Sequence, residues 1–124
     1  TLAMVFLSQS CLARLETMVL MAGVDLPVRA IREQVVGALD VIVQQARLKD
    51  GTRRVIAITE VVGMESDTVT LQDIYAFDFS AGRDEEGKFR GGLVATGIRP
   101  KFTQHLEDYG VHLPAAMFQQ GAAL

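Results

Sequence analysis

The chain has 124 residues, of which 49% are hydrophobic, and its formal net charge at pH 7 is −3. This length predicts one domain, since a chain of about 150 residues already hides roughly two-thirds of its unfolded surface. The negative charge argues against general nucleic-acid binding, which requires a clustered excess of lysine and arginine. Cys11 is the one cysteine, so an internal disulfide is excluded, a structural zinc site is not expected, and a reducing cytoplasm is the simplest compartment.

The first seven residues, Thr1 to Leu7, are almost wholly apolar. Polar residues 8–10 and then Arg14 interrupt the run, which falls far short of the ~20 apolar residues that a membrane-spanning helix needs. No basic stretch precedes it, which argues against a signal peptide. Because a small domain has difficulty covering such an apolar excess, we expect this run and the helix after it to support self-association.

Helical spacing marks two segments before residue 40. Apolar residues recur at intervals of three and four from Leu12 to Ala22, which predicts a helix buried on most sides that ends at Gly23. Pro27 opens a second, amphipathic helix. Its apolar stripe consists of Val28, Ile31, Val35 and Leu39.

From Val41 onward the residues become β-branched and alternate in polarity. We expect strands near residues 41–48, 54–62, 68–79 and 89–96. Short connections favour an antiparallel meander of three to four strands.

A last helix should open at Pro100 and close at Gly110, and Pro114 begins a tail. The expected fold class is therefore α+β, with two N-terminal helices, the antiparallel meander and a short C-terminal helix, all in a single domain over residues 1–124.

The loop Gly82-Arg-Asp-Glu-Glu-Gly-Lys88 has the glycine and lysine spacing of a phosphate-binding P-loop. Phe89, however, stands where the metal-binding hydroxyl belongs. Three successive carboxylates, at residues 84–86, would repel a phosphate, and the residues that follow predict a strand instead of a helix. We therefore interpret this segment as a solvated, mobile hairpin loop.

The segment Val55-Ile-Ala-Ile-Thr-Glu60 is an apolar strand that ends in a carboxylate, as does the strand that holds magnesium beside ATP in nucleotide-hydrolysing enzymes. Without a P-loop partner, we interpret it as a buried strand with Glu60 at its rim. The sequence contains no convincing nucleophile and base, metal cluster or acid–base dyad, so an independent enzyme of another class is the weakest hypothesis.

Arginines flank the turn at Asp50 and Gly51, namely Arg47, Arg53 and Arg54. A guanidinium at such a place can reach a phosphate or a carboxylate across a subunit boundary. The alternative is a surface or local salt-bridge role, because solvated turns are commonly flanked by basic residues.

Two further residues complete the candidates for a nucleotide or subunit-interface role. Asp73 interrupts an apolar alternation, and an unpaired buried charge is costly, so it should have a partner such as Arg47 or Arg54. Arg99 precedes the last helix, where it can pair with Glu107 or Asp108 or face water.

Four segments together resemble one protein family. They are Arg14-Leu-Glu-Thr-Met18, Arg29-Ala-Ile-Arg-Glu-Gln34, Asp40 to Arg54 with its continuation to Ile74, and Thr96-Gly-Ile-Arg-Pro-Lys-Phe102. They are similar to the secretion ATPases that drive assembly of Flp, or tight-adherence, pili, within the type II/type IV secretion group. The resemblance covers roughly residues 12–118 and lies in the last part of such an ATPase, whereas residues 1–11 depart from the family pattern. It implies a fragment of a RecA-like α/β motor domain.

The resemblance implies no active site in this chain, because the family's P-loop, acidic metal-binding box and histidine box all precede the segment seen here at Arg14–Met18. No catalytic residue, metal site or cofactor is therefore expected, and ATP and magnesium belong to the intact family member. The implied partners are other subunits of a hexameric ring and a membrane-embedded assembly platform at the cytoplasmic face. The expected contribution is subunit packing and force transmission. The alternative is a stand-alone, catalytically inactive paralogue that regulates such rings.

Overall fold

Two helices open the fold in the computed structural model, which describes residues 2–124 and the side chains of residues 9–124. Helix α1 runs from Leu2 to Met21 and helix α2 from Val28 to Ala38. Gly23 has a φ of 78° and supplies the left-handed residue after α1, as expected. The start of α1 lies well before Leu12 because the apolar residues ahead of it favour helix without showing a 3.6-residue period. The side chains of the apolar run Thr1–Leu7 lie outside the described residues.

The prediction that α1 is buried on most sides is wrong. Leu12 is 3% exposed, whereas Met18 is 58% and Met21 is 81% exposed. The reason is that α1 packs on the sheet and on α2 through a single face. The opposite face of its last two turns is uncovered among the described residues.

A four-stranded antiparallel sheet follows in the order β1-β2-β3-β4, so the predicted meander is confirmed. The strands are β1 (Val41–Arg47), β2 (Arg53–Glu65), β3 (Thr68–Phe77) and β4 (Leu93–Ala95). Strand β4 is shorter than the predicted strand at residues 89–96. The backbone amide of Phe89 donates instead to the carboxylate of Asp50, and Arg90 donates to Gly82, so these residues belong to a loop.

The C-terminal part is more elaborate than the predicted helix and tail. Helix α3 spans Phe102–Asp108, and two short 3₁₀ helices, η1 (Phe79–Ala81) and η2 (Ala115–Phe118), were not predicted. The tail returns to the sheet, where the amide of Ala95 donates to Ala122 and that of Leu124 donates to Leu93.

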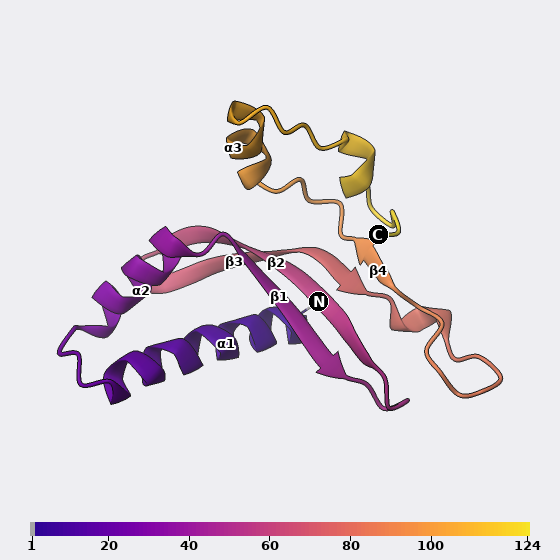
Figure 1. The fold of residues 1–124 in the computed structure, drawn as a ribbon, viewed down its shortest axis with the longest axis horizontal. Helices are drawn as coiled ribbons and strands as arrows, with labels where there is room; N and C mark the ends of the chain where they lie inside the picture. Colours follow the sequence, from indigo (N-terminus) through magenta and orange to yellow (C-terminus); the bar gives the residue numbers. More distant parts are fainter. Residues whose placement is uncertain (1) are drawn as a thin grey trace.

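Figure 1 shows α1 running beneath the sheet and α3 with the tail on the opposite side. Two hydrophobic clusters correspond to these layers. The first joins Leu12 of α1 to Ile42, Val61 and Val69 of the sheet. The second joins Ile74, Tyr75 and Ala95 to Phe118 of η2. The fold class is thus α+β, and no helix in the described part of the chain is long and apolar enough to cross a membrane.

Candidate functional site

One end of the sheet carries a hollow that combines cations with aromatic rings. We call it the hairpin pocket, because it lies between the β1–β2 turn and the loop that contains residues 79–89. Its volume is about 480 Å³. It is lined by Arg47, Leu48, Lys49, Phe79, Arg83 and Phe89.

Phe79 and Phe89 line the hairpin pocket, and the buried Phe77 packs behind them. The ring centroids of Phe77 and Phe79 are 4.7 Å apart, and those of Phe79 and Phe89 are 5.4 Å apart. The Phe79 and Phe89 rings meet edge to face at an interplanar angle of 81°, an arrangement that aromatic pairs prefer. This contact holds the two ends of the loop against the end of β3.

Asp50 joins the β1–β2 turn to the loop. One carboxylate oxygen accepts from the amide of Thr52 at 2.9 Å and from its hydroxyl at 2.6 Å, and the other accepts from the amide of Phe89 at 2.8 Å. The Thr52 hydroxyl, helped by these amides and by the charge of Arg54, holds the pKa of Asp50 well below its usual range. Lys88 adds a second link, because its ammonium group donates to the Asp50 carbonyl oxygen at 2.8 Å.

The P-loop-like segment Gly82–Lys88 closes on its own carboxylate. Asp84 accepts from the amides of Glu86 and Lys88, both at 2.9 Å. The amides that would cradle a phosphate are therefore occupied by an internal anion, and Lys88 is directed at Asp50. The residues of this loop do not fit ATP with magnesium, and among the described side chains no group of three His, Cys, Asp or Glu residues could hold a metal ion.

The three cations of the hairpin pocket have no carboxylate partner among the described residues. Arg47, Lys49 and Arg83 are all exposed, and Arg83 lies over Phe89 with its guanidinium carbon 4.6 Å from the ring centroid. Arg47 is also the direct register partner of Arg53, a like-charge pairing that disfavours the ladder. The result is an exposed cationic rim around an apolar floor.

Three nearby carboxylates bind backbone amides instead of these cations. Asp50 and Asp84 hold the amides described above, and Asp78 accepts from the amide of Ser80 at 2.9 Å. The Ser80 hydroxyl and this amide also lower the pKa of Asp78. Glu85 and Glu86 are exposed in the same loop and form no ion pair with a described residue, so this end of the molecule carries exposed carboxylates as well as exposed cations.

The other predicted arginines have separate surroundings. Arg54 is half-buried beside the hairpin pocket, where it donates to the carbonyl of Gly91 at 3.0 Å and lies 5.7 Å from the Phe77 ring centroid. Arg54 thus braces the pocket wall, whereas Arg53 is exposed. Arg99 pairs with Glu107 at 3.2 Å, one of its predicted partners, and so braces α3 away from the hairpin pocket.

Asp73 lacks the arginine partner that we expected. It is 6% exposed, and its register partner Thr59 donates a 2.7 Å hydrogen bond from the hydroxyl to Oδ1. Its second oxygen, Oδ2, has no hydrogen-bond partner among the described residues. The expectation failed because irregular pairing between Ile58 and Thr59 sets the register of this ladder, and the sequence pattern does not reveal that irregularity.

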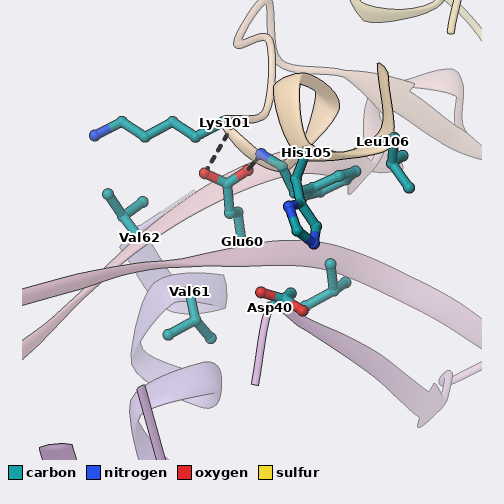
Figure 2. A pocket seen from close by; sticks show the side chains of 9 residues that line it. Asp40, Glu60, Val61, Val62, Lys101, His105 and Leu106 are labelled. Carbon is teal, nitrogen blue, oxygen red and sulfur yellow. Dashed lines mark hydrogen bonds between the residues drawn. The ribbon is translucent and has the colours of Figure 1, made fainter. Parts of the chain in front are cut away.

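A second hollow lies where β2 meets α3, with a volume of about 450 Å³. Figure 2 shows the carboxylate of Glu60 directed at the first turn of α3, while the side chain of Lys101 points away from it. Glu60 is 2% exposed and accepts from the amide of Lys101 at 3.1 Å and from that of Phe102 at 3.4 Å. Its carboxylate therefore caps α3. Sequence patterns do not reveal this role, because Glu60 and the start of α3 are about 40 residues apart in the chain. Glu60 is buried, as predicted for its strand, instead of lying at an open rim.

Comparison with known proteins adds no assignment, because neither a family model nor a curated protein matches the sequence.

Proposed function

We propose that this chain is the C-terminal part of a secretion ATPase that assembles Flp pilus-type fibres, and that it contributes packing and force transmission instead of ATP chemistry. The proposal rests on the four segments that resemble this family. It places the chain in a type II/type IV secretion motor at the cytoplasmic face of the membrane. Its partners are then neighbouring subunits of a hexameric ring and the membrane-embedded assembly platform.

The roles of these segments in the fold support a mechanical function. Glu16 of the first segment and Arg32 of the second form an ion pair at 2.6 Å that joins α1 to α2. Arg32 also donates to the carbonyl of Asp67 at 2.7 Å, which ties both helices to the β2–β3 turn. In the last segment, the amides of Lys101 and Phe102 bind Glu60. Three segments are thus used in internal packing.

The hairpin segment Asp40–Arg54 differs from the other three, and this observation carries the proposal. It presents Arg47 and Arg53 side by side and exposed, without a carboxylate partner in the described part of the chain. Unpaired guanidinium groups suit a contact with a carboxylate or a phosphate on a neighbouring subunit. We therefore assign the hairpin to subunit contact.

We propose that the uncovered face of α1 contacts the rest of the RecA-like motor domain. Between α1 and α2 lies an apolar groove of about 270 Å³, lined mainly by aliphatic side chains such as Leu15, Val19 and Ile31. Met18 and Met21 extend this apolar surface at the end of α1. Apolar surface of this kind commonly marks a protein–protein contact.

A second candidate function is a free-standing, catalytically inactive paralogue that joins or regulates rings of the intact enzyme. The loop Gly82–Lys88 favours an inactive role, because Asp84 occupies the amides that a phosphate would need. The two candidates differ in their partner. A motor part binds the catalytic portion that normally precedes it, whereas a regulator binds an already complete ring.

The test is to mix the isolated chain with the separately produced catalytic portion of a Flp pilus ATPase and to measure binding by calorimetry. We expect binding in about the micromolar range, weakened at least about tenfold by Met18→Ser combined with Met21→Ser. The matched control is Val43→Ser, because Val43 is 59% exposed on β1. Binding to complete rings alone supports the regulator, and binding to neither contradicts both candidates.

A further inference from the structure

The hairpin pocket has the chemistry to receive an apolar side chain that lies next to a carboxylate. Its floor is made by Phe79 and Phe89, and its rim carries the exposed cations Arg47, Lys49 and Arg83. Asp84 and Asp50 accept hydrogen bonds from the amides of Lys88 and Phe89, and none of the described carboxylates, the exposed Glu85 and Glu86 included, pairs with these cations. The three cations are therefore available to a carboxylate of another molecule.

The end of α3 presents that combination on the same chain. Tyr109 is 76% exposed, with its ring held edge to face against His105 at a centroid distance of 5.2 Å. Asp108 beside it is exposed and makes no ion pair with a described residue, whereas Glu107 is engaged by Arg99. A tyrosine next to a free carboxylate thus projects from this surface.

These two surfaces cannot meet within one chain. Figure 1 shows α3 above the sheet and the loop that contains residues 82–89 at the right-hand end of the molecule, well apart from each other. A contact between them therefore requires two copies. Because the two surfaces differ, the contact is heterologous, and repeating it gives either a closed ring or an open chain.

We propose that the hairpin pocket of one copy binds the α3 end of a second copy. Tyr109 packs on the exposed side of the Phe79 and Phe89 rings, and Asp108 pairs with Arg47 or Arg83 at the rim. An aromatic side chain buries about 150–250 Å², far below the roughly 1,600 Å² of a standard stable interface. The isolated contact is therefore weak, and association appears at chain concentrations of hundreds of micromolar. This contact does not depend on the proposed ATPase role.

A complementation experiment tests the proposal by sedimentation equilibrium. The pocket variant carries Arg47→Gln and Arg83→Gln, and the donor variant carries Asp108→Asn and Tyr109→Ser. Each variant alone is expected to be monomeric at about 1 mM, where the unaltered chain associates. Mixed together, they form dimers and nothing larger, because the mixture offers only one intact pocket and one intact α3 end per pair.

Arg53→Gln is the matched control, because it removes an exposed cation of the same hairpin that does not line the pocket. This variant should associate as the unaltered chain does, and about 1 M salt should weaken both, since the Debye length is then about 3 Å. Circular dichroism establishes that each variant is folded. A mixture that stays monomeric while the unaltered chain associates would overturn the proposal and point to another surface, such as α1. An unaltered chain that remains monomeric at about 1 mM would overturn it as well.

Discussion

Thr59 and Asp73 face each other across the β2–β3 ladder, and the threonine hydroxyl donates a 2.7 Å hydrogen bond to the carboxylate. The pair lies in the buried part of the sheet, where Thr59 is 0% and Asp73 is 6% exposed. A buried carboxylate is thus held by a neutral donor. Removing Asp73 therefore leaves no buried cation unpaired, so the expected loss of stability is smaller than for a buried ion pair.

Replacing Asp73 with alanine should lower the free energy of unfolding by about 1–3 kcal/mol, since the Thr59 hydroxyl then loses a buried acceptor. Asp73→Asn keeps an acceptor oxygen and should cost less. Urea denaturation of both variants, together with Thr59→Val in a double-mutant cycle, measures the coupling between the two side chains. A loss of about 3–5 kcal/mol in Asp73→Ala would instead indicate a buried ion pair.

The capping role of Glu60 predicts a local effect on α3. Glu60→Ala should cost about 0.5–2 kcal/mol, as loss of a helix N-cap does, and should speed amide hydrogen exchange at Lys101 and Phe102. Glu65→Ala is the matched control, because Glu65 is exposed at the end of the same strand. Unchanged exchange at both amides in the Glu60 variant would contradict the assignment.

The lowered pKa of Asp50 predicts that the stability of the fold depends on pH. Its pKa is lower in the folded chain than in an unfolded one, so its stabilising effect is present above the unfolded pKa of about 3.9 and is lost as the pH falls toward the folded value. The stability advantage of the unaltered chain over Asp50→Asn should therefore shrink below about pH 4. Asp78 titrates in both proteins and cancels in the comparison. Thermal melts of both proteins from pH 6 to pH 2 measure this difference in stability. A difference that stays constant or grows as the pH falls would be inconsistent with the hydrogen bonds from Thr52 and Phe89 to Asp50.

The loop Gly82–Lys88 should not bind ATP, because its amides hold Asp84 and Lys88 donates to Asp50. Calorimetric titration with ATP and magnesium is expected to give no heat of binding at micromolar concentrations. Lys88→Ala should leave this result unchanged while loosening the link to the β1–β2 turn. Micromolar binding that disappears in Lys88→Ala would establish a phosphate site here.

The pattern of the sequence predicts the element order and the meander because those features depend on local periodicity. Alternation from Val41 onward and the short turns between strands suffice for an antiparallel sheet. The end of α1 at Gly23 follows from the same kind of local signal. The start of α1 lies before the predicted one, because the apolar residues that precede Leu12 in the sequence show no 3.6-residue period.

The candidate site was less accessible to sequence reasoning, because it is made by contacts between distant residues. Arg47 was identified from the turn, but Arg83, Phe79 and Phe89 join it only through folding. A cue for the aromatic cluster is the presence of three phenylalanines, at positions 77, 79 and 89, at the two ends of a highly charged loop. Asp73 was recognised as unusual, yet its partner depends on an irregular ladder that no local pattern reveals.

The central claim, that this chain is the C-terminal part of a pilus-assembly motor, is tested most directly by ATP hydrolysis in a chimera. The chain replaces the corresponding part of a Flp pilus ATPase whose own catalytic portion is retained. The account predicts rings that hydrolyse ATP, with the rate reduced at least about tenfold by Arg47→Gln combined with Arg53→Gln, a loss of about 1.4 kcal/mol or more in transition-state stabilisation. Val43→Ser should leave the rate unchanged. A folded chimera that forms no rings and hydrolyses no ATP would contradict the account.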